Sequence, residues 1–154
     1  MRYFIAGLSF LIVLVSWPGV QAQINFPILN RAKSMDCVFL SKTFGYWNGE
    51  KVYAGVVDPD SDPESLINMD INSIDLIKET AVLKSEWGEE KVSVINSSKG
   101  LTFVHLSSSG NLWVLTVYPY YDPSRESFSS VLSEHTGWAG SGLPSQAYGF
   151  CWVR

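Results

Sequence analysis

The feature that most constrains the fold of this 154-residue chain is the position of its two cysteines. Cys37 lies near the start of the foldable region, and Cys151 lies close to its end. Neither belongs to the C-x-x-C motif that is typical of redox centres. In an oxidising compartment two such thiols pair, and their bridge would make the first and last structural elements neighbours. We therefore predict a structural disulfide between Cys37 and Cys151.

The first 22 residues predict such a compartment. Arg2 supplies a positive charge, residues 3–15 form an almost unbroken apolar run, and Val20 and Ala22 are small residues at the positions that signal peptidase recognises. The run is shorter than the roughly 20 apolar residues of a transmembrane helix. We expect a cleavable signal peptide over residues 1–22 and a secreted or periplasmic product that starts at Gln23 and has no stable membrane insertion.

Charge and length limit the partners and the domain organisation. The formal net charge is −4, and loss of Arg2 with the signal peptide would make it more negative. Nucleic acid is not an expected partner, because phosphate backbones bind clustered Lys and Arg, whereas the basic residues here are scattered singly. The length supports one domain. We expect an N-terminal segment over residues 23–35 and a single β-rich domain over residues 36–154.

The first half of that domain shows strand-like patterns. Residues 37–44 and 51–57 are expected to form a hairpin, because Asn48-Gly49 between them is a strong turn signal. An acidic loop with two prolines is expected over residues 58–64, and a strand over residues 66–71. The stretch 74–85 fits either a helix or a strand, and we favour a strand for its second half.

The second half predicts a meander of three strands, at residues 91–96, 101–106 and 111–118, with Pro119 ending the third. Residues 128–135 fit a strand or a short helix, 138–145 a loop, and 146–153 a closing strand. The fold class that follows is mainly β: a small antiparallel β-sandwich or barrel with at most one or two short helices, closed by one disulfide.

The sequence contains few candidates for catalysis. Its only histidines, His105 and His135, exclude a three-histidine zinc site, and there is no G-x-S-x-G motif. On a strand, Glu134 would point away from its neighbours Ser133 and His135, so adjacency does not make a catalytic triad. We predict no catalytic residue and favour a protein that is not an enzyme. The alternative hypothesis is a secreted hydrolase that uses His135 with Glu134 or an acid from residues 58–64.

Acidic residues raise a second alternative, a calcium-stabilised extracellular module. The aspartates of residues 58–64 have EF-hand spacing, but Pro63 stands where the loop needs glycine. A weaker match has Ser73 at the glycine position; its ligands would be Asn68, Asp70, Asn72 and Glu79. We therefore expect neither a bound metal nor a cofactor.

Aromatic residues make up 14% of the chain and gather in its C-terminal third. Exposed Tyr, Trp and Arg side chains dominate many protein interfaces. Several such residues fall in or near expected turns, and they predict a binding patch that consists of Tyr120, Tyr121, Arg125, His135 and Trp138.

A small, exported, acidic, disulfide-closed β-domain without a recognisable catalytic set favours one function. We expect a non-catalytic binding or inhibitory protein of the periplasm or extracellular space, whose partner is another secreted or periplasmic protein. In this outline the chain resembles periplasmic lysozyme inhibitors and the immunity proteins that neutralise secreted toxins, although it carries no motif of either family.

Overall fold

The computed structural model describes residues 23–47, 50–57, 66–85, 88–138 and 141–154. The predictions for the signal peptide, the turn at 48–49 and the acidic loop at 58–64 lie outside these residues. Within them, all strand pairings are antiparallel, and the one helix, α1 (Phe26–Leu29), is a single turn. No helix in the described ranges is long and apolar enough to cross a membrane.

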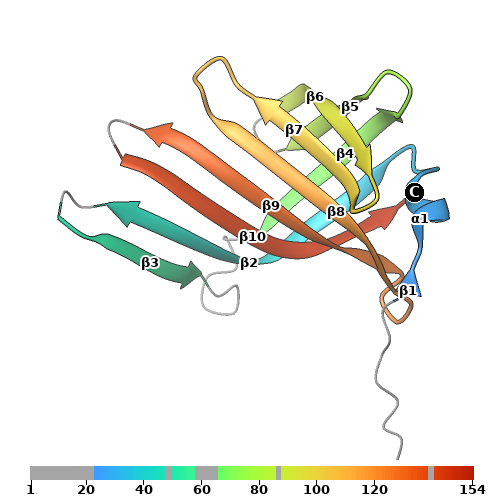
Figure 1. Ribbon diagram of the computed structural model, residues 1–154, viewed down its shortest axis with the longest axis horizontal. Helices are drawn as coiled ribbons and strands as arrows, with labels where there is room; N and C mark the ends of the chain where they lie inside the picture. Colours follow the sequence, from blue (N-terminus) through green and yellow to red (C-terminus); the bar gives the residue numbers. More distant parts are fainter. Residues whose placement is uncertain (1–22, 48–49, 58–65, 86–87, 139–140) are drawn as a thin grey trace, which may run out of the picture.

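Eight strands close into a barrel, which confirms the predicted fold class. Each strand pairs with the next, and the last pairs back onto the first, so the barrel has no unpaired edge (Figure 1). In chain order the strands are β2 (Met35–Trp47), β4 (Ile67–Asp75), β5 (Thr80–Ser85), β6 (Gly88–Ser97), β7 (Gly100–Leu106), β8 (Leu112–Asp122), β9 (Ser127–Trp138) and β10 (Ser141–Val153).

Two short strands lie outside the closed circuit. β1 (Gln23–Ile24) pairs with the end of β8, and β3 (Val52–Val57) pairs with the second half of β2. Figure 1 shows the β2–β3 and β9–β10 hairpins projecting together at the end of the barrel opposite α1 and the C-terminus.

Alternate residues of the strands fill the barrel. Buried Phe and Met side chains from β2, β4, β7 and β9 form much of this core, which includes Met35, Phe39, Met69, Phe103 and Phe128. An eight-stranded barrel is just wide enough for side chains to fill it or for one small ligand. Leu29 and Ala32, from the segment 23–35, are also buried in this core, so the N-terminal segment packs as part of the domain.

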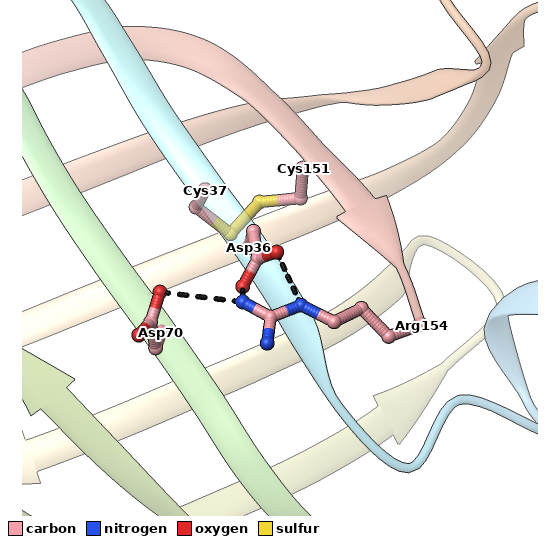
Figure 2. Close-up of a disulfide and its surroundings, with 5 residues drawn as sticks. All are labelled: Asp36, Cys37, Asp70, Cys151 and Arg154. Carbon is pink, nitrogen blue, oxygen red and sulfur yellow. Dashed lines mark hydrogen bonds and ion pairs between the residues drawn. A yellow bond between two sulfur atoms is a disulfide. The ribbon is translucent and has the colours of Figure 1, made fainter.

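The predicted disulfide is confirmed. Cys37 of β2 and Cys151 of β10 lie directly opposite each other in the strand pairing, are almost fully buried, and are bonded (Figure 2). On the outer surface beside them, the side chain of Arg154 forms ion pairs with Asp36 of β2 and Asp70 of β4. The end of the chain is thus tied to the first two strands of the barrel.

Most expected strands are confirmed. Residues 37–44 and 51–57 form the paired strands β2 and β3, the second half of 74–85 is β5, and the three-stranded meander is β6–β7–β8. Residues 128–135 belong to a strand, β9, rather than a helix.

Two predicted strand ends are wrong. β8 continues past Pro119 to Asp122, because the pairing with β9 is irregular between Val117 and Tyr121 and requires no N–H from the proline there. The expected loop over 138–145 is largely strand, since β10 begins at Ser141 and pairs with β9 from there. Pro144 is tolerated because β10 pairs with β2 only from Ser145 onward, so no N–H is required from the proline on that side.

Candidate binding site

The outer wall of the barrel carries a groove of about 490 Å³, which we call the outer groove. Its floor follows β9, where Ser129 and Val131 face outward because their neighbours Phe128, Ser130 and Leu132 are buried. Two small outward side chains on one strand, with larger ones on both neighbouring strands, leave a hollow between them. The lining residues are Leu40, Ser41, Tyr118, Arg125, Ser129, Ser130, Val131, Tyr148, Gly149 and Phe150.

Aromatic rings form the walls of the outer groove. Tyr118 rises from β8 on one side, where it stacks on Tyr120 at 6.3 Å between ring centroids. Tyr148 and Phe150 rise from β10 on the other side, where they pair across the sheet with Val131 and Ser129. Such a surface is mainly apolar with a few polar groups, as binding sites generally are.

Arg125 places a positive charge at one end of the outer groove. Its guanidinium lies 4.5 Å from the centroid of the Phe150 ring, and its backbone carbonyl accepts a hydrogen bond from the Trp152 indole N–H at 2.9 Å. Its Nε also lies 3.7 Å from Asp122. The hydroxyl of Ser124 donates to Asp122 and, with the Ser124 N–H and the charge of Arg125, keeps the pKa of Asp122 below its usual value. These contacts hold the turn and orient the guanidinium.

A β-bulge in β2 opens the far side of the outer groove. Phe39 lies opposite Gly149 and Ser41 opposite Tyr148, so Leu40 is an extra residue that the pairing does not use. Leu40 and Tyr148 are both exposed beside this irregularity. Gly149 is required there, because a Cβ atom would lie 2.0 Å from the carbonyl oxygen of Val38.

The structure divides the predicted binding patch between the two ends of the barrel. Tyr120 is exposed and stacks on Tyr118, whereas Tyr121 turns inward and packs against Phe128 at 5.2 Å. His135 lies seven residues beyond Phe128 on β9, which places it about 23 Å from Phe128 at the usual rise per residue. Trp138 ends β9, and its side chain lies outside the described residues. Of the five predicted residues, only Arg125 lines the outer groove, and Tyr120 reaches it only through its stacking on the lining residue Tyr118.

The same bulge brings a charged cluster into the opposite end of the barrel. Beyond Leu40 the alternation of β2 is shifted, so Lys42 lies opposite the buried Ala147 and on the inner face. Its ammonium contacts Oε2 of Glu134 at 2.7 Å, and the Ser145 hydroxyl donates to the same oxygen at 2.8 Å. Glu134 is 7% exposed. Its charge is thus neutralised inside the barrel and does not contribute to the outer surface.

The two histidines do not form a catalytic site with the described residues. As predicted from alternation, Glu134 is on the face opposite to His135, and the side chain of His135 forms no hydrogen bond or ion pair with the described residues. It lines a second hollow near β3. His105 lies against Trp113 and contacts Glu90 at 2.8 Å.

The described residues also contain no group of three or more His, Cys, Asp or Glu side chains that could bind a metal. Asn68, Asp70 and Asn72 of the weaker EF-hand match are on the strand β4, and Glu79 is in the turn after it. The other candidate loop, residues 58–64, is outside the described ranges.

Sequence reasoning missed most of the groove residues, among them Leu40, Tyr118, Ser129, Val131, Tyr148 and Phe150. The signal that could have found them is the run of small residues at alternate positions of 127–133, between two strands with aromatic residues at alternate positions. That signal becomes useful only once the pairing of β9 with both β8 and β10 is known.

The chain matches no family model, and no curated protein is significantly similar to it in sequence.

Proposed function

We propose that this chain is a non-catalytic binding protein of an oxidising, extracytoplasmic compartment, and that it inhibits or sequesters another protein there through the outer groove. The observation that carries the proposal is the outer groove itself: two walls made of three aromatic rings, a floor of small residues and an oriented guanidinium. Tyr and Arg are among the residues that contribute most to binding energy in protein interfaces.

The partner we propose presents an apolar or aromatic side chain next to a carboxylate. The apolar side chain would fill the space between Tyr148 and Tyr118, above Ser129 and Val131. The carboxylate would accept hydrogen bonds from Arg125, whose side chain is 54% exposed and whose ion-pair contact with Asp122 is long. A planar guanidinium that is already oriented loses little entropy when it binds a carboxylate.

Export is part of the proposal. The Cys37–Cys151 bridge is compatible with a periplasmic or extracellular protein, and the pattern of residues 1–22 is that of a signal peptide. Edman sequencing or intact-mass analysis of the secreted protein should give Gln23 as its first residue. A product that retains residues 1–22 would contradict this part of the proposal.

Affinity capture with matched variants tests the binding function. The wild type, Tyr148→Ser and Leu106→Ser are immobilised and exposed to the native secreted or periplasmic fraction. Tyr148→Ser removes a wall of the outer groove, and Leu106→Ser is the control, because Leu106 is an exposed apolar residue of β7 outside the groove. A partner captured by the wild type and the control, but lost with Tyr148→Ser, supports the proposal.

The competing results are distinct. A protein retained equally by all three baits would bind elsewhere, and the outer groove would not be its site. Recovery of a small molecule and no protein would make the chain a ligand carrier rather than an inhibitor. Once a partner is identified, Arg125→Ala should weaken binding by at least about tenfold, as expected for an interface hot spot.

A further inference from the structure

One end of the barrel is covered by residues 25–34, which include α1 and which we call the cap. Backbone hydrogen bonds join the cap to two strands: the Asn25 N–H donates to Pro119 of β8, and the Ile74 N–H of β4 donates to Lys33. The inner side of the cap packs into the core. Its outer side therefore forms the end surface of the barrel, where Figure 1 also shows the C-terminus.

The outer side of the cap is positively charged. Residues 23–35 contain Arg31 and Lys33 but no Asp or Glu. Lys99 adds a third cation from the neighbouring turn between β6 and β7. All three side chains are exposed, and none of them forms an ion pair with a residue that the structure describes. These charges are scattered in the sequence, and the fold brings them to one end.

Two of these cations flank a hollow of about 440 Å³ between the cap and the β6–β7 turn. Arg31 directly follows the lining residue Asn30, and Lys99 directly follows the lining residue Ser98. Amide and hydroxyl groups form most of the lining, together with one aromatic ring. Such groups donate hydrogen bonds to phosphate oxygens, and the strongest of these bonds come from cations. The lining residues are Phe26, Asn30, Asn96, Ser97 and Ser98.

Exposed isoleucines lie at the same end of the barrel. Ile28 of α1 is 41% exposed, and Ile24, two residues before α1, is 65% exposed. Ile77 is 95% exposed in the turn after β4, the strand to which the cap is hydrogen-bonded. Burying such side chains away from water is favourable, so this end presents apolar groups beside its cations.

The charges of the β4–β5 turn do not offset the cations of the cap. Asp75 accepts hydrogen bonds from the N–H groups of Ile77 and Lys78, and it pairs with the Lys78 ammonium at 2.9 Å. Glu79 is the remaining carboxylate of that turn. The cap and its two neighbouring turns therefore carry a net positive charge, on a chain whose formal net charge is −4.

We infer that this end of the barrel docks on a membrane surface rich in anionic phospholipids. Interfacial membrane proteins combine basic side chains, which bind lipid phosphates, with apolar side chains that enter the boundary between headgroups and acyl chains. Charge complementarity selects this occupant, because a lipid surface offers phosphates to the three cations and an apolar layer to Ile28 and Ile77 at once. The outer groove lies on the side wall of the barrel, so the inference does not depend on the proposed function.

Vesicle co-sedimentation of the oxidised protein that starts at Gln23 tests the inference. The wild type should bind vesicles of equal parts phosphatidylglycerol and phosphatidylcholine, and should not bind phosphatidylcholine alone. Each cation near an anionic surface contributes about fivefold to partitioning, so Arg31→Ser/Lys33→Ser should weaken binding by at least about tenfold. Lys84→Ser/Lys91→Ser is the matched control, because it removes two cations of β5 and β6 away from the cap, and it should bind like the wild type.

The apolar contribution has its own pair of variants. Ile28→Ser should weaken binding to the mixed vesicles by about fivefold, whereas Leu106→Ser, which changes an exposed residue at the far end of β7, should not. Circular dichroism verifies that all variants are folded.

Four results would overturn the inference: no binding to the mixed vesicles, equal binding to both kinds of vesicle, equal loss in the two double variants, or equal loss in the two single variants. Capture of a protein that requires Arg31 and Lys33, without vesicle binding, would assign this end to a protein partner instead.

Discussion

Removal of the Cys37–Cys151 bridge should destabilise this protein more than any single surface substitution. The bridge joins residues 114 positions apart in sequence, and it restricts the unfolded chain more than the folded one. For a loop of this length, the chain-entropy model gives about 5 kcal/mol at 25 °C. Domains of this size are typically stable by only about 5–15 kcal/mol, so the expected loss is a large part of the total.

Two considerations adjust the expected loss of stability, one from the native structure and one from the unfolded chain. The barrel pairs β2 with β10 over nine registered residue pairs, so these strands remain neighbours without the bridge, and the native state should keep its fold. Real unfolded chains are partly compact, which reduces the entropic gain of a cross-link. We therefore expect a measured loss of about 3–5 kcal/mol, with a fall in Tm of about 10–20 °C.

Urea denaturation of the oxidised wild type, the reduced wild type and the Cys37→Ala/Cys151→Ala double variant measures this loss. The m-value should rise without the bridge, because the unfolded state exposes more surface. The reduced wild type keeps both sulfur atoms, so its comparison with the double variant separates the effect of the cross-link from that of core packing. A loss below about 1 kcal/mol in the reduced protein, with an unchanged m-value, would refute the loop-closure argument.

Three further predictions concern single positions. Lys42→Met should cost about 1–3 kcal/mol in urea denaturation, because it leaves the carboxylate of Glu134 buried without its ion pair. Lys42→Met/Glu134→Leu should recover part of this loss, and an equal or larger loss in the double variant would argue against the buried pair as the cause. Gly149→Ala should lower stability by at least about 2 kcal/mol, because its Cβ would overlap the backbone of β2. Gly45→Ala has only ordinary contacts at that Cβ and should be tolerated, so equal effects would contradict the steric argument. Asp75 accepts hydrogen bonds from the N–H groups of Lys78 and Ile77 and pairs with the Lys78 ammonium; mainly through Lys78, its pKa falls to about 2. Because this folded-state pKa is below the unfolded value, the stability that Asp75 provides is present above about pH 4 and is lost as the pH falls towards 2; an NMR titration midpoint near 3.8 for Asp75 would contradict this.

The fold class was accessible from the sequence because it depends on local patterns. Strand-like patterns located the meander β6–β7–β8, and the two cysteines near the ends of the domain required the first and last strands to be neighbours. The choice of a barrel over a sandwich depends on whether β9 pairs with both β8 and β10, which is a non-local property. The continuation of β8 past Pro119 and the start of β10 at Ser141 were missed for the same reason. Proline, glycine and serine were interpreted as turn residues from the local sequence alone.

The candidate site was less accessible, because it depends on a one-residue irregularity. Strict alternation from Cys37 and Phe39 would place Lys42 on the outer surface, where its ammonium would lie far from the inward-facing Glu134. The extra residue at Leu40 reverses the faces of β2, turns Lys42 inward, and at the same time leaves Leu40 exposed beside Tyr148 at the outer groove. Only Gly149, which lets the two backbones approach at this point, marks the irregularity in the sequence. One bulge therefore accounts both for the neutralised charge inside the barrel and for the opening of the outer groove, and Gly149→Ala should perturb the two together.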